Sequence, residues 1–270
     1  MIRLGRDLFL AASIATLTAS VALAADKPPM EGVPVPMAPT TASSGWIFQV
    51  TPYAWAAGMK GDVSPFRRAP TIHVEKSFSD ILDDLNIAGF VNFWARNDRF
   101  VLSGDVMYVN IIESATTGPL PIIGAIGGGY DTAQFAATLQ AGYRLYDRPQ
   151  VTFDLMGGAR YWHLWNDLNV HAVGRTVRVE SRFGWLDPVL GARAHYHIND
   201  KFSVLAQGDF GGFGVGSDFT WQALATMNYS FNDKFTLSAG YKILSVDYDR
   251  GGRVFDTTLS GPVLGVTFQF

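Results

Sequence analysis

The sequence predicts an all-β chain that folds into a transmembrane, antiparallel, up-and-down β-barrel of about ten strands. Three observations support this prediction. Apolar and polar side chains alternate with a period of two over many segments, short Asn–Asp turns recur between these segments, and the N-terminus resembles an export signal. The composition agrees, because 28 Gly and 13% aromatic residues suit many turns and membrane-interface rings. An eight-stranded barrel is the structural alternative.

Residues 1–24 have the pattern of a secretory signal peptide. Two arginines precede an uncharged apolar run, and Ala22-Leu23-Ala24 fits the small-x-small cleavage rule. The alternative is an N-terminal membrane anchor, but the apolar run is short for a membrane span. Residues 25–45 are rich in Pro and small polar residues, so we expect a disordered periplasmic leader. The barrel is then expected over 46–270.

Four short turns rich in Asn and Asp divide the barrel region, and longer Gly-rich connections lie between them. Asn and Asp tolerate the left-handed backbone that tight hairpin turns require. Short turns at one end and long loops at the other are typical of outer-membrane barrels, whose short turns face the periplasm. The four turns are Arg96–Arg99, Tyr146–Pro149, Ile198–Lys201 and Phe231–Lys234.

Both ends of the mature chain and all four turns are placed on the periplasmic side, which requires an even number of strands. Thr71–Phe78 also alternates like a strand, but Ser79–Leu85 is too short to cross back and has the pattern of an N-capped helical turn. We therefore expect 59–85 outside the membrane, as a hairpin extension and a short helix over the barrel mouth. Further loops are expected at 113–129 and 166–184. The ten expected strands are 46–58, 86–97, 99–112, 130–146, 150–165, 185–198, 201–211, 218–232, 234–248 and 256–270.

The segment 218–232 indicates most clearly which side chains face lipid. Aromatic, Ala and Met side chains alternate there with Thr, Gln, Asn and Ser, and hydrocarbon cannot solvate the second set. The apolar set is therefore expected to face the membrane, with its aromatic residues near the strand ends as interfacial girdles. The alternative is a soluble lipocalin-like barrel with its apolar face inside, which the export signal and the turn asymmetry argue against.

The inward positions contain charged side chains of nearly balanced sign. Isolated buried charges are costly, so we expect these groups to pair across the lumen. Paired charges that fill the interior give a closed structural barrel, whereas unfilled space gives a small porin-like channel for small polar solutes. The expected lumen charge network is Arg96, Asp105, Arg144, Asp154, Arg160, Arg193, Asp209 and Lys242, with Asp187, His195, Gln140, Gln207 and Gln222 beside it.

No motif indicates a cofactor. Gly212–Gly216 resembles a nucleotide loop, but it joins two expected strands and no helix follows it. His195 and His197 lie on one face of a strand and could share a metal, yet no third ligand is evident nearby. The chain has no Cys, and its net charge of −3 does not indicate a nucleic-acid partner. We expect neither cofactor nor metal.

A hydrolytic site is the least favoured interpretation. His163, Asp167 and His171 are expected at the top of one strand, and Ser217 and Asp218 in another connection. A lipid- or peptide-hydrolysing enzyme would need a His–Asp–Ser set in hydrogen-bond contact, which separation along the sequence cannot show. We therefore expect no enzyme.

The last segment, Gly261–Phe270, alternates with a period of two and ends on an aromatic residue. It resembles the closing strand of bacterial outer-membrane barrels. The resemblance implies that Phe268 and Phe270 belong to an assembly signal for the barrel-assembly machinery.

Five further stretches are spread over nearly all of 46–270: Thr51–Trp55, Ser77–Leu85, Gly208–Gln222, Gly240–Tyr248 and Ser260–Gly265. They resemble a widespread family of proteobacterial outer-membrane β-barrel proteins, grouped with OmpA-like and surface-antigen barrels. The resemblance implies location in the cell outer membrane and contact with its lipid and lipopolysaccharide. It implies no reaction, ligand or oligomeric state.

Overall fold

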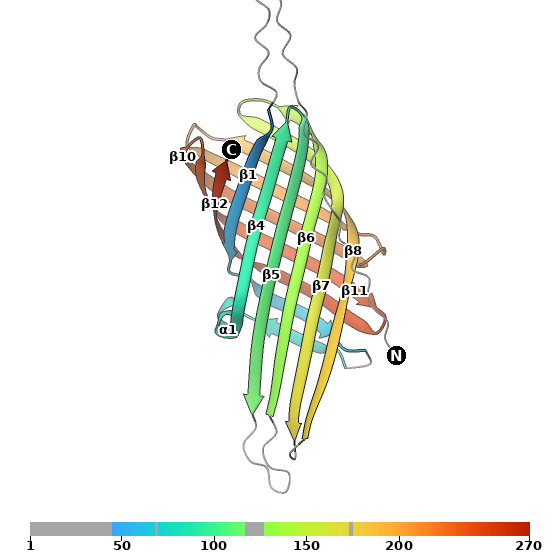
Figure 1. Cartoon of the computed structure of the whole chain (residues 1–270). Coiled ribbons are helices and arrows are strands. Elements are labelled where there is room, and N and C mark those ends of the chain that lie inside the picture. The colour runs from blue at the N-terminus through green and yellow to red at the C-terminus, as the bar shows by residue number, and fades with distance from the viewer. Residues whose placement is uncertain (1–44, 68–69, 117–126, 173–174) are drawn as a thin grey trace, which may run out of the picture. The chain divides into compact units, whose positions relative to one another are not determined.

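The computed structural model describes residues 45–67, 70–116, 127–172 and 175–270. Ten antiparallel strands of this part of the chain close into a barrel, because the first strand, β1 (Ile47–Trp55), pairs with the last strand (Figure 1). The other nine are β4 (Leu85–Asn97), β5 (Phe100–Thr116), β6 (Gly127–Asp147), β7 (Val151–Ala172), β8 (Arg175–His197), β9 (Phe202–Gly212), β10 (Phe219–Asn232), β11 (Phe235–Arg250) and β12 (Arg253–Gln269).

The predicted number of ten strands is confirmed, and the eight-stranded alternative is wrong. Each strand of the wall is antiparallel to its neighbours, as an up-and-down barrel requires. No helix in the described ranges is long and apolar enough to span a membrane. The predicted signal peptide and almost all of the predicted leader lie outside the described residues.

The predicted short turns are confirmed, and Asn side chains hold two of them. The side-chain oxygen of Asn199 accepts hydrogen bonds from the backbone N–H groups of Lys201 and Phe202, at 2.9 and 2.8 Å. The side chain of Asn232 accepts the equivalent bonds from the second and third residues after it. In the turn between β4 and β5, Asp98 has a positive φ of 52°, which Asp tolerates better than most residues.

The predicted loop at 166–184 is wrong, because β7 and β8 stay paired as far as Ala172 and Arg175. In this extension charged side chains such as Asp167 and Arg182 occupy the outward positions, which are apolar in the lipid-facing part of the strands. Backbone pairing therefore continues where the sequence pattern of a lipid-facing strand has ended. The predicted loop at 113–129 is likewise too long, since β5 ends at Thr116 and β6 begins at Gly127; its apolar stretch lies outside the described residues.

The segment 59–85 forms the predicted hairpin extension and helix. It contains β2 (Gly58–Ser64), β3 (Ile72–Lys76) and α1 (Phe78–Asp83). β2 continues the course of β1 along β12, and β3 folds back onto β2. Within the described ranges, the part of β4 before Val91 pairs with β5 alone, because the last three residues of β1 pair with β12 and not with β4. Ile81 of α1 is buried beside this part of the wall.

Ser77 is the N-cap of α1, so the helix begins at Phe78, one residue before the predicted Ser79. The Ser77 hydroxyl accepts a hydrogen bond from the backbone N–H of Asp80, whose carboxylate accepts one from the Ser77 N–H at 2.9 Å. These two bonds form a capping box. The Ser77 hydroxyl also donates to the Asp80 carboxylate at 2.7 Å, and this bond, together with the one from the Ser77 N–H, lowers the pKa of Asp80. Beside the helix, partial burial tends to lower the pKa of Lys76, but hydrogen bonds and ion pairs with Glu113 and Asp84 raise it overall.

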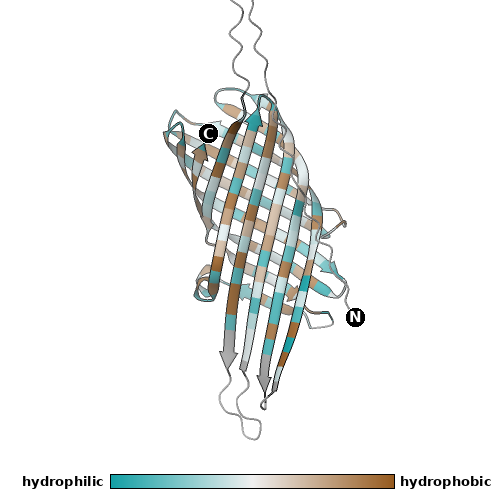
Figure 2. Cartoon of the chain, viewed as in Figure 1, coloured by the Kyte–Doolittle hydropathy of each residue, from teal (hydrophilic) through white to brown (hydrophobic). Residues whose placement is uncertain are grey.

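The two faces of the wall differ as the sequence predicts. Along β10 the outward Met227 is 57% exposed, whereas the inward Thr226 and Asn228 are 7% and 6% exposed. Figure 2 shows hydrophobic and hydrophilic residues alternating along the strands of the wall. Aromatic side chains of the outward set, such as Tyr143 and Phe231, are exposed near the short-turn end. This pattern is that of a barrel whose outer surface meets hydrocarbon.

Candidate functional site

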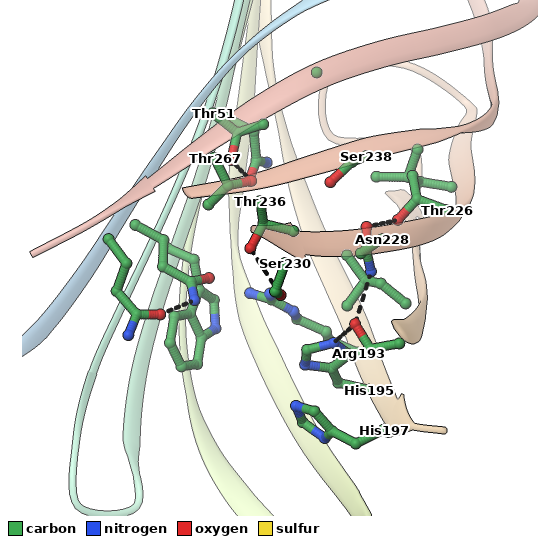
Figure 3. A pocket seen from close by; sticks show the side chains of 18 of the residues that line it. Thr51, Arg193, His195, His197, Thr226, Asn228, Ser230, Thr236, Ser238 and Thr267 are labelled. Carbon is green, nitrogen blue, oxygen red and sulfur yellow. Dashed lines mark hydrogen bonds between the residues drawn. The ribbon is translucent and has the colours of Figure 1, made fainter. Parts of the chain in front are cut away.

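The lumen contains a cavity of about 360 Å³ at the short-turn end, which we call the vestibule. It extends from the turn Asn199–Lys201 to the middle of the barrel. Figure 3 shows hydroxyl, amide and imidazole side chains projecting into it from several strands. Its lining includes Thr51, Tyr53, Trp94, Asp105, Arg144, Arg193, His195, Thr226, Asn228 and Lys242.

Lys242, Asp105 and Tyr53 close the inner end of the vestibule. The Lys242 ammonium donates hydrogen bonds of 2.8 Å to Asp105 Oδ1 and of 2.8 Å to Tyr53 Oη. Tyr53 Oη in turn donates to Asp105 Oδ2 at 3.0 Å. The three side chains come from β11, β5 and β1, so this group ties well-separated strands together across the lumen.

Arg144 and Arg193 face the same carboxylate, that of Asp154. In the strand register Asp154 lies opposite Arg144 on one side and opposite Arg193 on the other. Arg144 forms the ion pair with this carboxylate, with Arg144 Nε 2.7 Å from Asp154 Oδ1. The Arg193 guanidinium lies over the Trp94 ring, 4.6 Å from its centroid, and forms no ion pair within the described ranges.

Arg160 and Asp209 form the most buried ion pair, one layer further from the short turns. Their side chains are both 1% exposed, and Arg160 Nη2 lies 2.7 Å from Asp209 Oδ1. Arg160 also donates to the hydroxyls of Thr138 and Thr220 at 3.0 Å each. Gln222 donates to the second carboxylate oxygen of Asp209 at 2.6 Å. The pair is thus hydrogen-bonded on both sides, which is what a buried charge requires.

The other predicted charges have different partners. Arg96 lies near the short turns, where it donates to the Asp98 carbonyl and is 4.0 Å from Asp147, so it does not join the central group. Asp187 accepts from Trp185 Nε1 at 2.9 Å and from the Ser217 backbone N–H at 2.6 Å. It therefore holds a connection at the opposite end of the barrel.

An aromatic layer, which sequence reasoning missed, fills the lumen beyond the ion pairs. It comprises Trp162, Phe183, Trp185, Tyr248 and Phe255, all buried. Trp185 stacks on Tyr248 with 4.1 Å between ring centroids, and Trp162 lies 5.7 Å from Trp185 and 5.8 Å from Phe255. β7 and β12 lie on opposite sides of the ten-strand ring, so rings from opposite walls meet inside the lumen.

The sequence did contain a signal for this layer. Trp162 has the same parity as Arg160 on β7, and Trp185 has the same parity as Asp187 on β8. The period of two therefore places both indoles inside.

The residues considered for hydrolysis do not form a common site. His163 Nδ1 lies 2.9 Å from Tyr161 Oη on the outward face of β7, whereas Ser217 is buried beside Asp187. Asp167 is 3.6 Å from Arg178, and the side chain of His171 lies outside the described residues. In the described part of the chain, the structure does not assemble a His–Asp–Ser set from these side chains.

The vestibule contains one Ser–His contact. His195 Nε2 lies 2.9 Å from Ser203 Oγ, and the ring of His197 lies 4.3 Å from that of His195. Among the described residues, no carboxylate hydrogen-bonds His195, and no cluster of three potential metal ligands is present. The contact thus lacks the acid that orients the imidazole in a catalytic triad.

No protein-family model matches the chain, and no curated protein matches it. Solved structures do. The outer membrane protease OmpT from Escherichia coli matches with a TM-score of 0.51 and 10% identity over 84% of this chain and 98% of that one. The translocator domain of the autotransporter NalP from Neisseria meningitidis matches with a TM-score of 0.48 and 12% identity, over 84% and 89% of the two chains.

These matches concern the fold. The closed ten-stranded wall and its apolar outer surface define a transmembrane β-barrel, the fold that OmpT shares. At 10% identity the likeness to OmpT extends to the barrel architecture and not to its activity.

Proposed function

We propose that this protein is an integral barrel of the cell outer membrane with a structural or surface-exposed role, and that its lumen does not conduct solutes. One observation supports this proposal above the others. Trp162 and Phe255, from opposite walls, meet in a buried aromatic layer, and the Arg160–Asp209 pair lies next to it. A solute would have to displace both layers in order to pass.

The proposed orientation follows the usual one for this class, with the short turns in the periplasm and the long hairpins outside. Exported chains of this kind meet outer-membrane lipid and lipopolysaccharide on their apolar outer surface, and the barrel-assembly machinery at the last strand. We propose these as partners, with Phe268 and Phe270 in the assembly signal. The proposed role involves no catalysis and no cofactor.

Single-channel recording of the purified protein in planar bilayers tests the closed lumen. We expect near-zero conductance in the wild type and measurable conductance when Trp162→Ala and Trp185→Ala are combined, since both indoles belong to the blocking layer. Trp221→Ala is the matched control, because Trp221 belongs to the outward set and its loss leaves the lumen unchanged.

A small porin-like channel for small polar solutes is the second candidate, and the vestibule is the observation that favours it. Large, stable conductance in the wild type would establish this candidate and refute the closed barrel. Cell fractionation tests location separately, since recovery of the protein in the soluble periplasmic fraction would contradict the membrane assignment. Hydrolysis of a lipid or peptide that is lost in His163→Ala would instead indicate an enzyme.

A further inference from the structure

The vestibule has an excess of positive charge. Five Lys and Arg side chains line it, against two carboxylates. The cations are Arg96, Arg144, Arg193, Lys201 and Lys242, and the carboxylates are Asp105 and Asp200. An enclosed space whose walls are mainly of one sign raises the local concentration of ions of the other sign.

Arg96, Arg144 and Lys242 have carboxylate partners, whereas among the described residues Arg193 and the exposed turn residue Lys201 form no ion pair. Lys242 is paired with Asp105 at 2.8 Å, and Arg144 is paired with Asp154 at 2.7 Å. Arg193 lies opposite the same Asp154 in the register, yet Arg144 already holds that carboxylate. Arg144 also lies 3.4 Å from Asp147, which Arg96 approaches at 4.0 Å, so three guanidinium groups meet two carboxylates here and one positive charge is left over.

Trp94 keeps the surplus guanidinium in place. The Arg193 guanidinium lies over the Trp94 ring, with 4.6 Å between its central carbon and the ring centroid. Cation–π stacking of this kind stabilises a guanidinium without consuming its N–H donors. Those donors therefore stay available to an anion, and their planar fork matches the two oxygens of a carboxylate or phosphate.

Other polar side chains line the vestibule together with this guanidinium. His195 and His197 follow Arg193 on the same strand face, and His195 contacts Ser203. Figure 3 shows Thr226, Asn228, Ser230, Thr236 and Ser238 on neighbouring strands of the same cavity. Hydroxyl and amide groups both donate and accept hydrogen bonds, so this wall suits the hydroxyl groups of a ligand.

We propose that the vestibule binds a small solute with one oxyanion on a hydroxyl-rich body, and that Arg193 is the charge partner of the oxyanion. The cavity of about 360 Å³ lies near the lower limit of ligand sites, so it admits one small molecule and not a polymer. Because the vestibule reaches the turn at the short-turn end, the solute enters there while the aromatic layer stays closed. The proposal goes beyond the structural role and does not depend on conduction.

Isothermal titration calorimetry of the full chain in detergent micelles tests this site at constant ionic strength. Sodium gluconate is the carboxylate probe, glucose 6-phosphate the phosphate probe, and sorbitol the neutral probe. We expect saturable binding of at least one anion, at least tenfold weaker binding in Arg193→Gln, and no binding of sorbitol. The tighter of the two anions identifies the oxyanion that the site prefers.

Lys234→Gln is the matched control, because Lys234 lies in a short turn at the same end but does not line the vestibule. Its affinity for the anions should equal that of the wild type. Heat-modifiable gel mobility checks that each variant is folded. If Arg193→Gln does not fold, Arg193→Lys, which retains the charge but not the fork, should fold and bind several-fold more weakly.

Four results would overturn the proposal. These are absence of saturable binding for both anions, equal binding of sorbitol, unchanged affinity in the folded Arg193 variants, and equal losses in Arg193→Gln and Lys234→Gln. The last result would indicate general attraction to the positive rim. Conductance has no bearing on any of these outcomes, so failure of this proposal and failure of the closed barrel can be told apart.

Discussion

Removing one member of the Arg160–Asp209 pair should destabilise the barrel far more than removing a charge from its surface. Asp209→Ala leaves the Arg160 guanidinium enclosed, since both side chains are 1% exposed and no other carboxylate contacts Arg160 in the described residues. Its remaining hydrogen bonds go to the hydroxyls of Thr138 and Thr220, which do not neutralise the charge. The uncompensated cation is the source of the expected loss.

Breaking a buried pair in this way typically costs about 3–5 kcal/mol. The matched control is Glu75→Ala, which breaks the Lys60–Glu75 pair, 3.4 Å apart with side chains 64% and 67% exposed. Exposed pairs contribute only about 0–1 kcal/mol, because water and salt screen them. Replacing both buried partners, as Arg160→Met with Asp209→Leu, should restore much of the stability, since no charge is left without a partner.

Urea unfolding of the protein in lipid vesicles, followed by tryptophan fluorescence, measures these differences in stability. Trp162 is buried in the lumen two residues after Arg160, so its fluorescence reports on this region. The reasoning is refuted if Asp209→Ala unfolds within about 1 kcal/mol of the wild type, which is the range of an exposed pair. It is also refuted if the double replacement is as unstable as Asp209→Ala, because the loss would then not come from an unpaired charge.

Four further predictions concern the outer surface, the helix and the last residue. Ala225→Arg, near mid-membrane on the outward face, should lower the free energy of unfolding by about 2–4 kcal/mol in the same urea assay. Thr226→Arg points into the vestibule and should lower it less. Equal losses would show that the assignment of the two faces is wrong. Ser77→Ala should cost about 1 kcal/mol of helix stability and speed hydrogen exchange in 78–83 while the barrel stays intact. The folded-state pKa of Asp80 is lowered from 3.8, so the contribution of its carboxylate to the cap is complete above pH 3.8 and should be lost as the pH falls through the folded-state pKa. Protection of 78–83 from hydrogen exchange that does not change over this acid range would contradict the capping box. Deleting Phe270 should reduce the outer-membrane level of the protein while refolding in detergent stays nearly normal, and an unchanged level would remove the terminal residue from the assembly signal.

The wall of the barrel could be predicted from the sequence because its determinants are local. Alternation along 218–232 fixes which side chains face outward, and turn residues such as Asn199 and Asn232 fix where strands reverse. The extension of β7 and β8 could not be predicted in the same way. Beyond the hydrocarbon, water solvates both faces of a strand, so the alternation that marks a lipid-facing segment is absent although backbone pairing continues.

The pairs inside the lumen could be predicted only as a set. The alternation of side chains along each strand places Arg144, Asp154 and Arg193 on the inner face. It gives neither their positions along the barrel axis nor their rotamers. The position of a residue along the barrel axis depends on strand tilt and stagger, which are properties of the closed barrel as a whole. The sequence therefore could not show that Arg144 takes Asp154 and leaves Arg193 on Trp94, although the vestibule depends on that choice.

The pairing of β1 with β12 also sets the order in which the chain can fold. Every other neighbouring pair in the ten-stranded wall joins strands that are consecutive or nearly so, whereas Gln49 hydrogen-bonds Gln269 across 220 residues. Loop-closure entropy makes such a contact slow to form, so the β1–β12 seam, the pairing that closes the ring, should form after the hairpins have assembled. Until then the first and last strands each expose an unpaired edge. The seam is thus the point at which slow assembly would let a second chain pair with the first, and at which an assembly factor would act to most effect.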